Sequence, residues 1–181
     1  MRMQENKIEC IPLYSLNIFK TEVNNLNFEY LINYLYNLKK MLPSSSKSNI
    51  GGYQSPDNLY LDSNFFSLIN IFNKIHNNIT QSQNSKIDSL WFNISSFTNY
   101  NDLHTHQNPP IYSDNKLSGV LYLQTPQNSG SIKLFNPLDL NSSLVIFPTK
   151  GDLLIFPQIL PHSVSPNLSK EDRISIAFNY E

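Results

Sequence analysis

The spacing of apolar residues changes once along the chain, near residue 86, and this change limits what the chain can fold into. Before it, three- and four-residue steps predict one helix over 25–42 and a second that begins at Asp62 or Ser63. After it the period is two. Candidate strands are an entry strand at 11–19 and later ones at 87–97, 117–124, 131–135, 144–147, 152–156, 162–165 and 172–179. We therefore predict an α+β, mainly β fold: a jelly roll with two supporting N-terminal helices.

The length and the even composition of the chain indicate one domain. The 181 residues contain no internal repeat and no linker. We predict a single domain over 1–181, in which 1–85 is a helical support region and 86–181 is the jelly-roll core that carries the functional site.

Charge and composition exclude several classes of protein. The net charge of −1 provides no basic field for nucleic acid. The single cysteine, Cys10, cannot form an internal disulfide, which fits a reducing compartment. The first residues lack the apolar region of a signal peptide, and no apolar run is long enough for a membrane span. We expect a cytoplasmic protein, and a homodimer is compatible with these features.

Three of the four histidines have the spacing of a metal site. His104 and His106 are two residues apart, so a strand would direct both imidazoles to one face. His162 follows His104 by 58 positions (162 − 104). Neutral imidazole nitrogens bind iron, zinc, copper and nickel well. The fourth histidine, His76, lies among polar neighbours of the second predicted helix, where we expect solvent exposure.

The last predicted strand carries a cation on a polar face. Arg173 follows His162 by 11 positions (173 − 162), and Ser175, Ala177 and Asn179 share its face of the strand. Inside a barrel this guanidinium would need an anion, and a carboxylate accepts two parallel hydrogen bonds from it. An exposed edge strand would show the same alternation, so both interpretations stay open.

Several short motifs together resemble one family. HTHQNPP, LSGVLYL, KGDLLIFPQILPHSV and DRISIAFN resemble the Fe(II)- and 2-oxoglutarate-dependent oxygenase superfamily, and most of all a branch of phage and bacterial proteins. The loop SNIGGYQS resembles the N-terminal signature of that branch. The resemblance implies a double-stranded β-helix, a non-haem Fe(II) centre, 2-oxoglutarate as cosubstrate and O2. It also implies hydroxylation of an unidentified substrate with release of succinate and CO2, in a cytoplasmic protein that a phage could encode.

The predicted metal face departs from the superfamily's His-x-Asp…His pattern. His106 stands where most members have the aspartate. We predict that His104, His106 and His162 are the metal ligands, and that Asp102 orients one imidazole N–H. The alternatives are that Asp102 itself supplies the missing carboxylate, that His106 contacts the substrate, and that the chain binds iron poorly.

The resemblance also assigns residues to the cosubstrate. Arg173 and Ser175 would hold the distal carboxylate of 2-oxoglutarate. Tyr122 in SGVLYL and Asn93 in LWFNIS lie where such enzymes often place further contacts, although a structural role is an equal alternative for both. Asn179 is a candidate for a position behind the metal ligands.

Two other functions stay open. A cupin is also a double-stranded β-helix with His-x-His and a later histidine, but cupins usually have a glutamate where Pro110 and Ile111 stand here. The other is a non-catalytic jelly-roll module that binds a glycan or a protein. The substrate is a small molecule or a macromolecule, and segments 107–116, as a lid, and 136–143 are predicted to shape its pocket.

Overall fold

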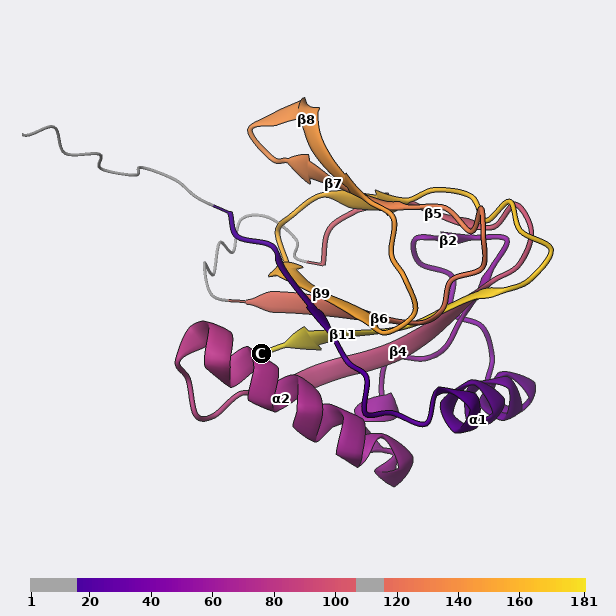
Figure 1. Cartoon of the computed structure of the whole chain (residues 1–181), viewed down its shortest axis with the longest axis horizontal. Coiled ribbons are helices and arrows are strands. Elements are labelled where there is room, and N and C mark those ends of the chain that lie inside the picture. The colour runs from indigo at the N-terminus through magenta and orange to yellow at the C-terminus, as the bar shows by residue number, and fades with distance from the viewer. Residues whose placement is uncertain (1–15, 107–115) are drawn as a thin grey trace, which may run out of the picture.

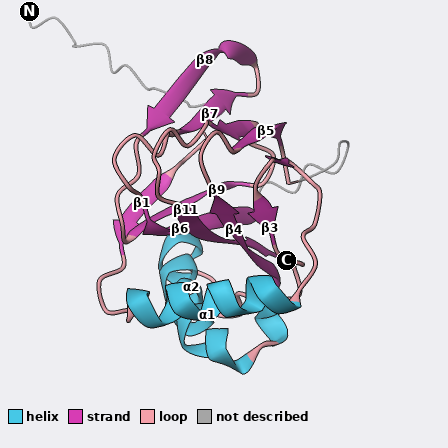
Figure 2. Cartoon of the chain, turned by 90° about the vertical axis from the view of Figure 1, so that its right-hand side faces the viewer, coloured by secondary structure: helices cyan, strands magenta, loops and turns pink. Residues whose placement is uncertain are grey.

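Two antiparallel sheets face each other, and two helices cover the outer face of the larger sheet (Figures 1 and 2). The computed structural model describes residues 16–106 and 116–181. The larger sheet contains, in spatial order, β1 (Phe19–Glu22), β9 (Asp152–Pro157), β6 (Leu117–Gln124), β11 (Arg173–Tyr180), β4 (Ile87–Ser95) and β3 (Tyr53–Gln54). The smaller sheet contains β2 (Asn49–Ile50), β5 (Tyr100–His104), β10 (His162–Val164), β7 (Ile132–Asn136) and β8 (Asp139–Ile146). The predicted α+β jelly roll with two supporting helices is confirmed.

The helices begin close to their predicted positions. The first, α1 (Phe28–Met41), begins after Asn27, whose side chain accepts a hydrogen bond from the Tyr30 N–H at 3.0 Å. The second, α2 (Phe66–Thr80), follows two 3₁₀ turns at Leu59–Leu61 and Ser63–Phe65. No helix among the described residues is long and apolar enough to cross a membrane.

The prediction that His76 is exposed is wrong. The side chain is buried, its ring lies 3.8 Å from the ring of Tyr180 between centroids, and its Nδ1 bonds to the Ser85 hydroxyl. His76 follows the buried Leu68 and Phe72 in four-residue steps, so it continues the apolar stripe of α2. The polar residues beside it in sequence lie on the other face of the helix.

Strand β11 is central rather than an edge strand, because β4 and β6 pair with it on either side. Its apolar face points to the helices, where the rings of Phe178 and Phe72 stack with centroids 4.2 Å apart. Gly119 on β6 makes room for this packing, since a Cβ there would overlap the Phe178 ring. The opposite, polar face of β11 therefore points to the space between the sheets, and the edge-strand interpretation is wrong.

The strands also depart from the sequence-based prediction in places. Three short strands come from the predicted support region. Of these, β1 and β3 are part of the larger sheet and β2 is part of the smaller sheet. Strand β5 lies in a polar segment that periodicity had left unassigned. Segment 136–143, predicted to be a pocket loop, is largely the β7–β8 hairpin, which projects from the sandwich (Figure 1) and exposes Leu138, Leu140 and Leu144.

Candidate metal and cosubstrate site

A cavity of about 520 Å³ lies between the two sheets. Every residue that the sequence assigned to the site lines it: Asn93, Asp102, His104, His106, Tyr122, His162, Arg173, Ser175 and Asn179. Segment 136–143 does not line it, so the prediction that this segment shapes the pocket is wrong; four of its residues border a separate, shallower hollow. The predicted lid at 107–116 lies, except for Lys116, outside the described residues.

The three predicted metal ligands meet in this cavity. Each offers one ring nitrogen, and these atoms all lie within 4.8 Å of one another. His104 ends β5 and pairs directly with His162, the first residue of β10. His106 lies beyond the end of β5, so regular strand alternation does not position it; its N–H instead donates to the Gln158 carbonyl at 3.0 Å. The convergence was predicted correctly, but only His104 lies on the strand.

Backbone carbonyls orient two of the imidazoles. Nδ1 of His104 lies 2.7 Å from the carbonyl oxygen of Asp102, and Nδ1 of His162 lies 2.9 Å from that of Leu160. A carbonyl can only accept, so each Nδ1 must carry the proton. The lone pair of each ring is then on Nε2, as a metal ligand requires.

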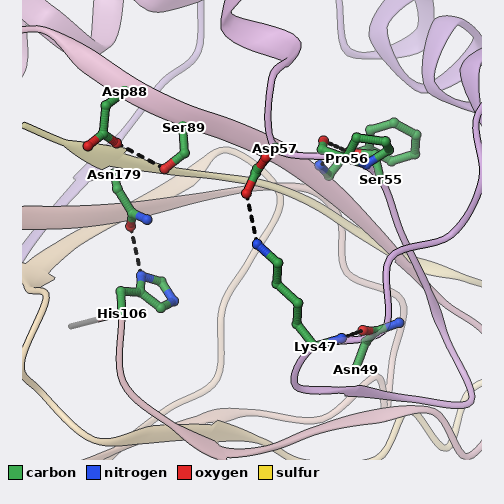
Figure 3. A network of polar contacts seen from close by, with 10 residues as sticks. Lys47, Asn49, Ser55, Pro56, Asp57, Asp88, Ser89, His106 and Asn179 are labelled. Carbon is green, nitrogen blue, oxygen red and sulfur yellow. Dashed lines mark hydrogen bonds and ion pairs between the residues drawn. The ribbon is translucent and has the colours of Figure 1, made fainter. Parts of the chain in front are cut away.

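Side chains orient the third imidazole. Nδ1 of His106 lies 2.8 Å from Oδ1 of Asn179 (Figure 3). The Ser118 hydroxyl lies 2.6 Å from the same Nδ1 and donates to Oδ1 of Asn179 at 2.7 Å. Trp91 packs edge-on against the ring at 5.4 Å between centroids. With Asn179 as the acceptor, Nε2 of His106 also carries a lone pair. The predicted place of Asn179 behind the ligands agrees with this contact, and Ser118 is a partner that sequence reasoning missed although it shares a strand face with Tyr122.

Burial keeps the three imidazoles neutral. Burial, with the neighbouring His104, lowers the pKa of His106 to about 4 and, with both other histidines, that of His162 to about 3. Burial also lowers the pKa of His104, against the opposing effect of the Asp102 carbonyl. A metal ion therefore need not displace protons from this site at neutral pH.

Asp102 contacts the site through its main chain, and its carboxylate acts on His104 only through its charge, which opposes the lowering of the His104 pKa. Its carbonyl orients His104, whereas its carboxylate accepts a hydrogen bond from the N–H of Leu103 at 2.9 Å. Among the described residues, the group that could hold an ion here contains the three histidines and not Asp102. The geometry thus favours a three-histidine face over one completed by this carboxylate.

Arg173 brings a free donor to the same cavity. The side chain is 3% exposed, and its Nη1 donates to the carbonyls of Ser129 and, at 2.9 Å, Ser165. Gly130 leaves room for the guanidinium, because a Cβ there would lie 2.8 Å from Nη1. Nη2 is buried without a partner among the described residues. A buried, charged donor without a partner is costly, so this position suits an anion.

Ser175 belongs to a row of polar side chains that crosses the larger sheet. It pairs with Tyr122 on β6 and with Asn93 on β4, and Asn93 pairs in turn with Gln54 on β3. Burial raises the pKa of Tyr122, so its hydroxyl stays protonated and can donate. Sequence reasoning missed Gln54, although it lies in the SNIGGYQS segment.

One protein family matches part of the chain. Residues 136–179 match the family described as "Putative 2OG-Fe(II) oxygenase". The matched segment contains His162 and Arg173 but not the His104–His106 pair. No curated protein sequence matches the chain.

Solved structures match nearly all of the chain. The non-heme alpha-ketoglutarate-dependent carbocyclase SnoK from nogalamycin biosynthesis aligns with a TM-score of 0.72 and 10% identity, over 91% of this chain and 79% of that one. A prolyl-4-hydroxylase from Pseudomonas putida aligns at 0.68 and 15%, over 92% and 93%. HygX from Streptomyces hygroscopicus, with nickel, 2-oxoglutarate and hygromycin B bound, aligns at 0.66 and 13%, over 91% and 82%.

These similarities confirm the fold and the resemblance to the superfamily. The matched family is one of 2OG-Fe(II) oxygenases, and another aligned structure, from Burkholderia pseudomallei, is named an oxidoreductase of the 2OG-Fe(II) oxygenase family. Iron or 2-oxoglutarate is present in several of the aligned structures. The narrower branch of phage and bacterial proteins stays a prediction.

Proposed function

We propose that this chain is a non-haem Fe(II)- and 2-oxoglutarate-dependent oxygenase that hydroxylates a substrate. One observation carries the proposal: a single cavity contains three imidazoles with inward lone pairs and a buried guanidinium with an unpaired N–H group. The first arrangement fits a divalent transition metal, and the second fits a carboxylate. A molecule that is a metal ligand at one end and a carboxylate at the other would satisfy both.

The chain's residues would divide the work between them. His104, His106 and His162 would hold the metal, and their Nδ1 partners fix the rings so that little reorganisation is needed on binding. When bound, Fe(II) with 2-oxoglutarate supplies the activation of O2, so that a substrate C–H bond is hydroxylated and succinate and CO2 are released.

The cosubstrate would be anchored on β11 and β6. Nη2 of Arg173 would donate to its distal carboxylate, and Ser175 and Tyr122 lie on neighbouring strands of the same face to add donors. The outer carbonyl contacts of Arg173 hold the guanidinium in place, so that its free edge stays directed to the cavity.

Turnover of 2-oxoglutarate without substrate tests the proposal. Purified protein with Fe(II), ascorbate and O2 should convert 2-oxoglutarate slowly to succinate, measured by chromatography against a metal-free sample. Anaerobic addition of Fe(II) and 2-oxoglutarate should also produce a weak visible charge-transfer band. Protein with bound metal but no succinate above the metal-free sample would favour the non-catalytic module. The cupin interpretation does not explain why Nη2 of Arg173 is buried without a partner in this cavity.

A further inference from the structure

Beyond the cosubstrate anchors, the polar row on the larger sheet continues for two more strands. Gln54, Asn93, Ser175 and Tyr122 lie directly across from one another on β3, β4, β11 and β6, and all four line the cavity. Directly opposed residues of antiparallel strands point to the same face. The amides of Gln54 and Asn93 are therefore neighbours on the cavity wall.

The segment around Gln54 fixes its backbone firmly. Ser55 donates from its N–H to the Phe92 carbonyl and accepts from the Phe92 N–H at its hydroxyl, both at 3.0 Å. The Gln54 carbonyl accepts from the Ser45 N–H at 2.8 Å. Hydrogen bonds to β4 and to the segment at Ser45 thus hold the main chain around Gln54, and its side chain lines the cavity.

One acceptor in this pair lacks a partner. Oδ1 of Asn93 is buried and unpaired among the described residues. Gln54 is 4% exposed and lines the cavity beside it, but its amide atoms are not among the buried groups that lack a partner. Buried polar groups nearly always have partners, and leaving one unpaired costs about 1–3 kcal/mol. The unpaired acceptor of Asn93, beside the amide of Gln54 on the cavity wall, therefore suits a ligand that carries a donor.

The position of Gln54 separates it from the cosubstrate. The proposed anchors lie on β11 and β6, and His106 is bonded to Asn179 and Ser118 on the same two strands. Asn93, which the sequence offered as a cosubstrate contact, lies on β4 beside Gln54 and is assigned here to a second molecule instead. Strand β3 is two strands from β11, or roughly 10 Å at the usual strand spacing of about 4.8 Å. The β3–β4 side of the cavity is thus free for a second molecule beside the cosubstrate.

We propose that Gln54 and Asn93 form a subsite for a neutral amide group of the primary substrate, such as a peptide or carboxamide group. This placement beside the cosubstrate rests on the proposed function. Each side-chain amide offers one acceptor and donors in one plane, and another amide is the neutral group that complements both. Lys47, the cation at the rim of the cavity, is already paired with Asp57 at 2.8 Å (Figure 3), so its charge is compensated.

Two small neutral probes distinguish an amide subsite from a merely polar wall. N-methylacetamide has the N–H donor, and methyl acetate is its ester counterpart without that donor. We would titrate each into ¹⁵N-labelled protein loaded with Zn(II) and 2-oxoglutarate, and follow the side-chain amide signals of Gln54 and Asn93. N-methylacetamide should shift both signals saturably, and methyl acetate should bind at least tenfold more weakly. Equal binding of the two probes, or no shift, would overturn the proposal.

Variants identify the residue responsible. Gln54→Leu should weaken N-methylacetamide binding at least tenfold and leave the 2-oxoglutarate dissociation constant within twofold. Gln54→Met, which keeps the length of the side chain but loses both the amide donor and the amide acceptor, provides the same test if the leucine variant does not fold. Gln124→Leu is the matched control, because Gln124 donates to the Asp172 carbonyl at 2.8 Å outside the cavity lining; it should leave probe binding unchanged.

The 2-oxoglutarate titration separates this proposal from the proposed function. Loss of 2-oxoglutarate binding in Gln54→Leu would assign Gln54 to the cosubstrate and overturn the amide subsite. Parent protein that binds N-methylacetamide in a Gln54-dependent way but never binds 2-oxoglutarate would uphold the amide site and overturn the oxygenase proposal.

Discussion

The two ends of the polar cavity are built in opposite ways. At the histidine end, the protein satisfies the donor of each imidazole on its outer side and leaves three lone pairs pointing inward. At the arginine end, it satisfies Nη1 with carbonyls and leaves the Nη2 donor inward. One end is neutral and requires a cation; the other is a cation and requires an anion. Under the proposed function, such a cavity would bind a metal ion and an anionic cosubstrate together without a carboxylate among the three side chains that face the ion.

The largest effect should come from removing a ligand at the histidine end. His106→Ala should lose metal about as severely as His162→Ala, by more than about a hundredfold in Fe(II) affinity, because losing a ligand exceeds the 10–100-fold cost of outer contacts. His106→Asp should bind Fe(II) at least as well as the parent, since it restores a charged ligand. Metal content and competitive titration would measure this. Full iron content in His106→Ala would refute the three-histidine face.

Substitution of Arg173 should weaken 2-oxoglutarate binding without weakening metal binding. Arg173→Leu should raise the 2-oxoglutarate KM by about a hundredfold while Fe(II) binding stays nearly intact, because losing one partner of a buried charged pair costs about 2–5 kcal/mol. Arg173→Lys should recover part of the loss, since an ammonium cannot make two parallel hydrogen bonds. Steady-state kinetics and a metal titration on the same samples check both statements. Unchanged cosubstrate affinity in the leucine variant would show that the anchor lies elsewhere.

A smaller effect should follow from loosening one imidazole. Asn179→Ala leaves only the Ser118 hydroxyl beside Nδ1 of His106, and a hydroxyl can donate as well as accept, so the tautomer is no longer fixed and Fe(II) affinity should fall by about 10–100-fold. Ser118→Ala is the matched comparison, because it leaves the amide oxygen of Asn179, which can only accept; its loss should be smaller. Equal losses in the two variants would mean that the hydroxyl, and not the amide, orients His106.

The smallest effect is expected at Asp102. Its sequence position suggested a carboxylate that orients an imidazole, for which a loss of about tenfold or more would follow. The structure makes this contact through the carbonyl, which alanine keeps. Asp102→Ala should therefore lower Fe(II) affinity by less than the roughly 10–100-fold that is typical of a lost outer contact. An Asp102→Ala protein devoid of iron would restore the carboxylate-ligand interpretation.

The polar face of the last strand was the most predictable part of the site. Arg173, Ser175 and Asn179 alternate with large apolar residues, as expected for a strand with one face on an apolar core and the other on a polar cavity. The His-x-His pair and the later His162 predicted the convergence of three imidazoles. The alternation is local in sequence, whereas the distant His162 could be joined to the pair only through the family resemblance.

The remainder depended on contacts between distant segments. Strand β5 is half-exposed and polar, so periodicity could not find it, and β2 and β3 have two residues each. The four-residue steps from Leu68 and Phe72 to His76 indicated that His76 is buried, but its polar neighbours in sequence led to the prediction of an exposed side chain. Gln54 carries no chemical signal until its pairing with Asn93 is known.

The orientation of His106 ties its ring to the larger sheet through Asn179 and Ser118, whereas His104 and His162 lie on strands of the smaller sheet. An ion bound by all three would therefore clamp the two layers together. Unfolding would then have to break coordination before the layers could part, so metal loss would accelerate unfolding and digestion by proteases. Loss of the metal ion would therefore end activity and make the protein easier to degrade at the same time.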